Sequence, residues 1–257
     1  MLKVNKLTKK LLNVMILSML KTLTKPILNI IYPLKCVHCN ALTLKDDKHL
    51  CDECFYSLAR QTPPFCLKCG RSINQEKDIK EGICLNCKTK NFHFDKAWSI
   101  CSYEGLIRDL IHNFKYRQKL QYQYIFKSLI NEFLETYKIL NDIDIIIPIP
   151  LHATRLRERE YNQSQILANI VSETINKPIL SDTLIRIKNT KPQIELSDKQ
   201  RIQNISGCFA IRNQHAINSG NILLIDDVFT TGATISEAAR IIKEYNPGKI
   251  FALTLAC

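Results

Sequence analysis

The sequence has no apolar run long enough to cross a membrane. Its N-terminal apolar stretch, residues 11–20, holds ten residues between Lys10 and Lys21, whereas a membrane-spanning helix needs about 20. No small-residue cleavage site follows this stretch, so a secretory signal peptide is not expected either. We predict that residues 1–34 form a basic, weakly amphipathic helix on a membrane surface or on the rest of the protein, with Met15 and Met19 as alternative start residues.

Acidic residues are missing from the first 45 positions, which contain eight lysines. The chain has a formal net charge of +12, so residues 46–257 together carry a net charge of only +4. A basic segment of this kind fits a solvated helix face as well as a contact with nucleic acid or a membrane. With 46% hydrophobic and 23% charged residues, the composition excludes disordered and fibrous proteins.

Strand and helix patterns alternate from about residue 95 onward. The chain length of 257 residues favours two units, because single cores usually stop growing near ~250 residues. Two segments, residues 144–149, which are apolar after Asp144, and the apolar run 222–225, are typical of strands buried on both faces. We expect further strands at 96–103, 184–187, 208–211 and 250–255, and helices at 106–116, 163–175 and 233–245.

This alternation predicts a mostly parallel α/β sheet. Ligands of such sheets bind beyond the carboxyl ends of the strands. A polar stretch, residues 188–207, is too long for an ordinary connection between strands. We therefore expect a functional lid or a disordered segment there.

Eight of the eleven cysteines form four Cys-x-x-Cys pairs. Eleven residues separate the first two pairs and fourteen separate the last two. Two pairs suit one tetrahedral zinc ion and leave no open position for a substrate, so we predict two structural zinc sites, paired sequentially or interleaved. Zinc thiolates also predict a reducing, cytoplasmic location, and Cys101, Cys208 and Cys257 are expected to be small apolar fillers. The predicted zinc ligands are Cys36, Cys39, Cys51, Cys54, Cys66, Cys69, Cys84 and Cys87.

Two adjacent acids, Asp226 and Asp227, follow the apolar run 222–225. Carboxylates at the end of a buried strand need hydroxyl donors or a cation, because burying an unpaired charge is unfavourable. Residues 230–234 supply threonine hydroxyls, a glycine and the N–H groups of a helix start, which bind phosphate. A sugar phosphate would satisfy both halves of this site.

Residues 222–234 closely resemble the signature with which type I phosphoribosyltransferases bind 5-phosphoribosyl pyrophosphate (PRPP). The resemblance implies that Asp226 and Asp227, the predicted catalytic residues, hold the ribose 2′ and 3′ hydroxyls, and that Mg²⁺ bridges pyrophosphate and ribose oxygens. Residues 147–152 resemble the family's pyrophosphate loop, and arginines follow them. The predicted PRPP-binding residues are Asp226, Asp227, Val228, Phe229, Thr230, Thr231, Gly232, Ala233, Thr234, Pro148, Ile149, Pro150 and Arg159.

A wider set of motifs resembles the ComF family of competence-associated, phosphoribosyltransferase-like proteins over roughly residues 27–257. The resemblance implies a type I phosphoribosyltransferase fold with an N-terminal double zinc ribbon. It divides the chain into a helix at 1–34, the ribbon at 35–92 and the phosphoribosyltransferase-type domain at 93–257. The motifs are Tyr32-Pro33 before Cys36, Tyr103-Glu104-Gly105, Lys115-Tyr116, Pro148 to His152, Arg159 to Gln163, Arg186 with Thr190 and Gln193, Arg201 with Asn204, and Gly207 to Phe209.

Within these motifs, Lys115, Arg201 and Asn204 are expected to be accessory site residues. Glu160 departs from the family, which usually has glycine at this position, and the usual glycine after Lys115-Tyr116 is also absent. Thr230 stands where oxopurine-type relatives have an acid. This difference argues against an oxopurine salvage enzyme.

Two functions fit these observations. One is a Mg²⁺-dependent phosphoribosyltransferase with an unidentified acceptor, for which Lys191 or Lys199 is a candidate acid or base. The other is a non-catalytic protein of DNA uptake that senses PRPP or binds single-stranded DNA, with a competence helicase or other DNA-uptake proteins as partners. Aromatic residues interleaved with basic ones at 114–124 fit stacking on DNA bases, and helix packing explains them equally well.

Overall fold

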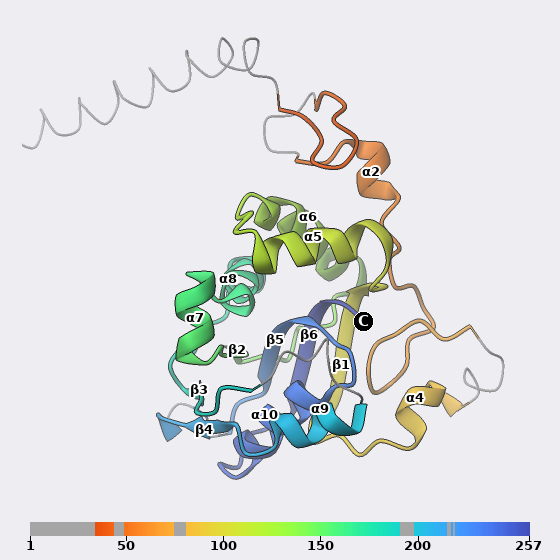
Figure 1. Cartoon of the computed structure of the whole chain (residues 1–257). Helices are drawn as coiled ribbons and strands as arrows, with labels where there is room; N and C mark the ends of the chain where they lie inside the picture. Colours follow the sequence, from red (N-terminus) through yellow and green to blue (C-terminus); the bar gives the residue numbers. More distant parts are fainter. Residues whose placement is uncertain (1–33, 44–48, 75–80, 191–197, 215–216, 218) are drawn as a thin grey trace, which may run out of the picture. The chain divides into compact units, whose positions relative to one another are not determined.

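The computed structural model describes residues 34–43, 49–74, 81–190, 198–214, 217 and 219–257 (Figure 1). These residues belong to two compact units, Met1–Ser57 and Leu58–Cys257. All but the last residue of the helix predicted at 1–34 lie outside the described residues. Among the described residues, no helix is long and apolar enough to span a bilayer. The domain boundaries predicted after residues 34 and 92 stay predictions.

The described part of the first unit contains one short antiparallel bridge and one short helix. An antiparallel bridge joins Lys35 to Leu42, and Asn40 turns the chain between them with a φ of 61°. Asparagine tolerates this left-handed conformation better than most residues. Helix α2, Asp52–Tyr56, completes the described part of this unit.

A four-stranded parallel sheet forms the centre of the second unit, which confirms the predicted α/β architecture. The strand order is β1-β6-β5-β2. Strand β5 is fully buried from Ile222 to Ile225, as its continuous apolar run predicts. The strands are β1 (Lys96–Cys101), β2 (Ile145–Pro148), β5 (Ile222–Val228) and β6 (Ile250–Ala256).

The register of β2 and β5 defines the edge of the sheet at which the acid pair lies. Pro148 of β2 pairs with Ile225 of β5, and β2 ends there. Strand β5 continues against β6, where Asp226 pairs with Thr254. The carboxyl ends of β2 and β5 are therefore adjacent. The two remaining strands, β3 (Leu184–Arg186) and β4 (Phe209–Ile211), form a separate antiparallel pair.

Helices cover both faces of the main sheet (Figure 1). Helices α5, α6 and α8 lie on one face, where α8 packs against β2 and β5, and α9 and α10 lie on the other. The expected helices at 106–116, 163–175 and 233–245 are present with small changes of boundary. The helices are α4 (Leu85–Lys88), α5 (Gly105–Tyr116), α6 (Tyr122–Tyr137), α7 (Ala153–Arg159), α8 (Gln163–Ile175), α9 (Asp198–Ile205) and α10 (Ala233–Lys243).

Part of the polar stretch 188–207, where a functional lid or a disordered segment is expected, forms helix α9. Helix α9 packs against α10, and its Ile205 is only 2% exposed. The other isoleucine of the helix, Ile202, is 55% exposed, so Ile205 anchors a helix that is otherwise mostly polar. Residues 191–197, between β3 and α9, lie outside the described residues.

The second cysteine cluster belongs to the same unit as the sheet. Its four cysteines are buried together with apolar residues of β1, β5 and α10. Ala97 N of β1 donates to Lys68 O at 2.7 Å. Gly70 has a φ of 71°, and a Cβ atom there would lie 2.5 Å from Ala97 O. Glycine therefore lets the cysteine turn approach the backbone of β1 closely.

Candidate functional site

The acid pair lies where β5 extends beyond β2, and its two side chains have different partners. Asp226 Oδ1 accepts hydrogen bonds from Ser164 Oγ at 3.0 Å and from Asp227 N at 2.9 Å. Asp227 Oδ2 lies 2.7 Å from Lys115 Nζ, and the exposed fractions of the two side chains are 11% and 19%. Lys115, Asp226 and Asp227 are predicted site residues. Ser164 is not among them, and the N-terminus of α8 brings it beside Asp226.

Burial and the neighbouring charge change the acidity of this pair. Desolvation raises the pKa of Asp226 to about 7, and the charge of Asp227 adds to this effect, whereas Lys115 opposes it. Burial alone would lower the pKa of Lys115, but the attraction of Asp227 raises it. Lys115 therefore stays protonated and neutralises one of the two acids.

The loop after the acids begins helix α10 with a glycine in the left-handed conformation. Gly232 is the N-cap residue of α10, with a φ of 78°. A Cβ atom at this position would lie 2.6 Å from Phe229 Cζ and 2.7 Å from Phe92 Cε1. Thr231 Oγ1 accepts from Ala233 N at 3.3 Å. The first-turn N–H groups of α10 form the positive end of the helix dipole.

A second loop leaves β2 beside the acids. Asn162 Nδ2 donates to Ile149 O at 3.0 Å and so ties this loop to the start of α8. Arg159 lies 4.8 Å from the centre of the Tyr116 ring, and its Nη1 donates to Gln163 Oε1 at 3.2 Å. The guanidinium of Arg159 is thus held in place by stacking and by a hydrogen bond.

Glu160 adopts a left-handed conformation at the end of α7, with a φ of 67°. This backbone angle explains why glycine suits the position, since glycine reaches it without steric cost. Tyr161 OH, directly after it, donates a hydrogen bond to Phe114 O of α5. The turn that contains Glu160 is therefore fixed to the helix that carries Lys115.

A cavity of about 720 Å³ opens at this edge of the sheet. Six cationic side chains line it against three acids, so its lining is predominantly positive. Of the predicted residues, it collects Lys115, Ile149, Pro150, Arg159, Arg201, Asp226, Asp227, Val228, Thr230 and Thr234. The other predicted residues, Pro148, Phe229, Thr231, Gly232, Ala233 and Asn204, do not line it.

Two lining residues that the site prediction omits have buried donors. Gln163 Nε2 and Arg186 Nε are buried and have no hydrogen-bond partner among the described residues. Arg186 Nη2 donates to Thr190 Oγ1 at 2.5 Å. Arg155 Nη2 donates to Thr190 O at 2.7 Å. Arg186 is recognisable in the sequence only as part of a motif, because its side chain reaches the cavity from the separate β3–β4 pair.

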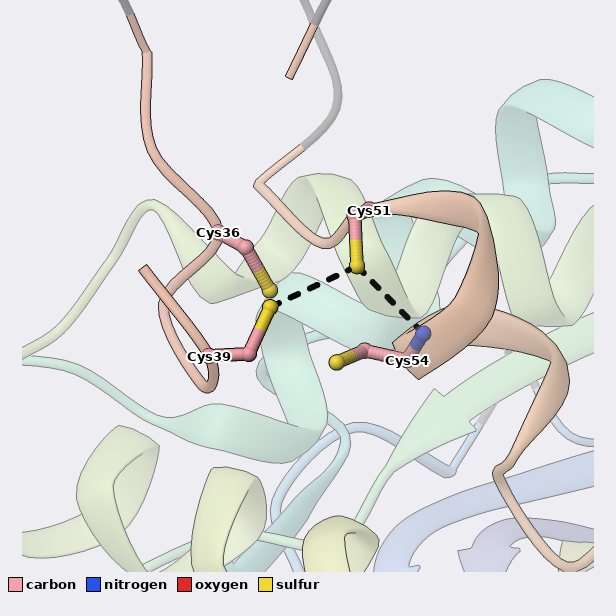
Figure 2. A group of neighbouring side chains, drawn as sticks. All are labelled: Cys36, Cys39, Cys51 and Cys54. Atoms are coloured by element: carbon pink, nitrogen blue, oxygen red, sulfur yellow. Dashed lines mark hydrogen bonds between the residues drawn. The ribbon is translucent and has the colours of Figure 1, made fainter. Parts of the chain in front are cut away.

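The eight cysteines form two clusters in sequential order, so the interleaved arrangement is excluded. Within each cluster the four sulfur atoms lie within 4.8 Å of one another. Figure 2 shows the first cluster, in which the Cys39 and Cys51 sulfurs are 3.6 Å apart. In the second, the Cys69 and Cys84 sulfurs are 3.7 Å apart. A tetrahedral zinc ion with Zn–S bonds of about 2.3 Å requires sulfur separations of about 3.8 Å, so both clusters fit zinc.

Known proteins with similar sequences include competence proteins and DNA utilization proteins. Residues 27–88 match the family model that is described as "Double zinc ribbon domain". Competence protein F of Haemophilus influenzae is 26% identical over 226 residues, 86% of this chain and 96% of that protein. Competence protein ComFC of Bacillus subtilis is 29% identical over 209 residues, 78% of this chain and 80% of that protein. DNA utilization protein YhgH of Salmonella typhimurium is 25% identical over 206 residues, 75% and 90% of the two chains.

Solved structures give a weaker similarity. Glutamine PRPP amidotransferase from B. subtilis matches 50% of this chain and 25% of its own, with 14% identity and a TM-score of 0.34. Because this TM-score is low, the α/β fold is assigned from the chain's own parallel sheet and not from this match.

Proposed function

Because the chain is similar to competence proteins F and ComFC and matches a double zinc ribbon domain, we propose that its second unit binds PRPP and that the protein acts in DNA uptake. One observation carries the proposal. The acid pair and five arginines converge on one cavity at the carboxyl ends of β2 and β5. PRPP combines a diol for the acids with phosphates for the cations.

Each part of PRPP would find its complement in the cavity. The ribose hydroxyls would donate hydrogen bonds to Asp226 and Asp227. The 5′-phosphate would lie at residues 230–234, where the N-terminus of α10 favours an anion. The pyrophosphate would lie toward Arg155 and Arg159, because guanidinium groups bind phosphate oxygens in a bidentate manner.

Magnesium fits the donors of the site, since carboxylate and phosphate oxygens are the ligands that it prefers. Asp226 is the carboxylate that would contribute, because Oδ2 of Asp227 already pairs with Lys115. When bound with PRPP, Mg²⁺ would offset the negative charge that develops on the pyrophosphate leaving group.

We propose phosphoribosyl transfer to an unidentified acceptor as the activity of this site. Bond breaking at the ribose C1 would leave positive charge on the sugar, which Asp226 would stabilise in its ionised form. Thr230 offers a hydroxyl where oxopurine-type relatives have an acid, so we expect no activity with oxopurines. The predicted acid or base candidates Lys191 and Lys199 have side chains outside the described residues. The alternative is that PRPP is a sensed ligand without transfer.

The decisive experiment combines PRPP binding with release of pyrophosphate. Calorimetry with PRPP and Mg²⁺ should show binding by the wild type and none by Asp226→Ala with Asp227→Ala. The exposed acid Asp182 provides the control, and Asp182→Ala should bind normally. Pyrophosphate release with one nucleobase or oligonucleotide would establish transfer, and PRPP binding without release would favour the sensor. Unchanged binding by the double variant would contradict the site.

Single-stranded DNA is a second proposed ligand, favoured by exposed side chains on α5 and after it. Tyr116, Leu120 and Tyr124 are 47%, 42% and 49% exposed, and Arg117 and Lys119 lie between them in the sequence. Phe114 and Tyr122 are buried, so only part of the predicted aromatic set is accessible for stacking. Fluorescence anisotropy with a labelled oligonucleotide should show binding that weakens steeply with salt and is reduced by Tyr116→Ala with Tyr124→Ala.

A competence helicase or other DNA-uptake proteins are the proposed partners, and a reducing cytoplasm is the proposed location because the two clusters need free thiols. The membrane contact predicted for residues 1–34 also remains a proposal.

A further inference from the structure

The second cysteine cluster is packed against the loop predicted to hold phosphate. Phe92, which follows the cluster, and Phe229 of the loop have ring centroids 6.0 Å apart. His93 N donates to Ser236 Oγ on α10 at 3.1 Å. A Cβ atom at Gly232 would collide with both phenylalanines. The metal-binding segment and the loop therefore form one packed structure within the second unit.

A small cavity of about 140 Å³ lies between them. It has room for a few water molecules, and so for one phosphate group but not for a nucleoside. Its polar lining comes from the turns of the cysteine cluster, from α9 and from the loop, and Arg201 and Thr230 also line the 720 Å³ cavity. The polar residues around it are Arg71, Asn86, Lys90, Arg201, Thr230 and Thr231.

Arg71 supplies a buried donor at this cavity. Its Nε is buried and has no hydrogen-bond partner among the described residues, while its guanidinium also bonds to Cys257. Because Arg71 lines the cavity, an anion there would pair with the charge of its guanidinium.

The cysteine turns hold the cations of this cavity in place. Arg71 O accepts from Cys66 N at 2.8 Å, within the first turn of the cluster. Lys90 N donates to Cys87 O at 3.3 Å, directly after the second turn. Since zinc fixes the conformation of both turns, it also fixes the positions from which these two side chains reach the cavity.

We propose that Arg71, with support from Lys90, completes the subsite for a phosphate monoester, so that the second zinc ribbon is part of the ligand-binding site. This inference rests on the proposed PRPP binding and adds a residue from outside the phosphoribosyltransferase-type motifs. The 5′-phosphate is contacted from one side by residues 230–234 and from the other by the ribbon. Zinc in the second cluster then sets the affinity for this phosphate, and zinc in the first cluster does not.

Calorimetry with three probes tests the proposal on the full-length, zinc-loaded protein. Arg71→Gln should weaken binding of ribose 5-phosphate and of PRPP by the same factor, about 10- to 100-fold. Binding of pyrophosphate with Mg²⁺ should be unchanged, because it would occupy the Arg155 and Arg159 side. Lys68→Gln is the matched control, since Lys68 lies in the same turn and does not line the cavity.

Zinc content and melting temperature confirm that each variant is folded. If Arg71→Gln does not fold, Lys90→Gln replaces it and should weaken the same two probes in the same pattern. Wild-type affinity of the folded variant for ribose 5-phosphate would overturn the inference and leave PRPP binding intact. A wild type that binds none of the probes would overturn both. Weaker binding of a single-stranded oligonucleotide, with ribose 5-phosphate unaffected, would assign the subsite to DNA and contradict the proposal.

Discussion

Lys115 Nζ lies 2.7 Å from Asp227 Oδ2, and this ion pair joins the last turn of α5 to the end of β5. The pair is mostly buried, with 19% and 11% of the two side chains exposed. It gives the two adjacent acids different electrostatic roles. Asp227 is neutralised by Lys115, whereas the pKa of Asp226 is raised by burial and by the charge of Asp227.

A double-mutant cycle should show strong coupling between Lys115 and Asp227. Removal of one partner leaves a buried charge, so Lys115→Met and Asp227→Asn should each lower the free energy of unfolding by about 1 to 3 kcal/mol. The double variant should cost clearly less than the sum of the two, with a coupling energy of about 1 to 2 kcal/mol. Urea unfolding of the four proteins measures this.

Lys127 and Glu173 provide the matched control, because their atoms are 2.8 Å apart but the side chains are 47% and 64% exposed. Exposed pairs contribute less than about 1 kcal/mol. Equal coupling energies for the two pairs would contradict the role assigned to burial.

Asp226 should make stability depend on pH near neutrality. Its folded-state pKa of about 7 lies above its ordinary value of 3.8, so the folded protein binds the proton more tightly than the unfolded chain does. The free energy of unfolding should therefore fall as the pH rises between these two values. Asp226→Asn keeps the shape and lacks the charge, so it should gain about 2 kcal/mol over the wild type between about pH 5.5 and pH 8.

Urea unfolding of zinc-loaded wild type and variant across this window measures the gain, because zinc affinity itself falls in acid. Asp182→Asn, at an exposed position, should show no such trend. A constant difference between Asp226→Asn and the wild type at every pH would refute the assignment.

Local sequence patterns predict those elements of the fold and the site that depend on residues close together in the chain. The cysteine pairs, the buried strand before Asp226 and the helix start at Gly232 each lie within about a dozen residues. Helix α6 also has such a pattern, with buried residues at spacings of three and four from Tyr122 to Leu134, although it is missing from the predicted elements. It was therefore predictable from hydrophobic periodicity.

Contacts between segments that are far apart in the chain cannot be predicted from such local patterns. Lys115 reaches Asp227 across 112 residues, and Arg71 shares a cavity with Thr230, although nothing in either local sequence indicates the partner. These contacts depend on how the sheet stacks its strands and helices. The contact of the second cluster with the core of the sheet unit is of the same kind, because its cysteines pack against residues that are distant in the sequence.

Gly232 should tolerate no side chain. A Cβ atom there combines a φ of 78° with distances of 2.6 and 2.7 Å to two phenylalanine rings, so Gly232→Ala should lower the free energy of unfolding by about 2 to 4 kcal/mol. It should also weaken PRPP binding, because the loop must move. Gly105 has a φ of 52° but no atom within 4 Å of the added Cβ. Gly105→Ala should therefore cost only about 1 kcal/mol, and equal losses in chemical denaturation would contradict the clash.

The two zinc sites should differ in what they stabilise. Metal analysis of the purified chain should give about two zinc ions. Cys39, in the first unit, and Cys66, in the core of the second, are ligands of separate clusters, so Cys39→Ser and Cys66→Ser should each remove one ion. Trp98 is the single tryptophan, and it lies on β1 beside Gly70 of the second cluster.

Tryptophan fluorescence therefore reports on the unfolding of the second unit alone. Cys66→Ser should lower its melting temperature by about 10 °C or more, because it removes both a metal and core packing. Cys39→Ser should leave the same transition within about 2 °C of the wild type. Equal shifts in both variants would mean that the first cluster stabilises the sheet unit, and an unchanged transition in Cys66→Ser would remove the second cluster from its core.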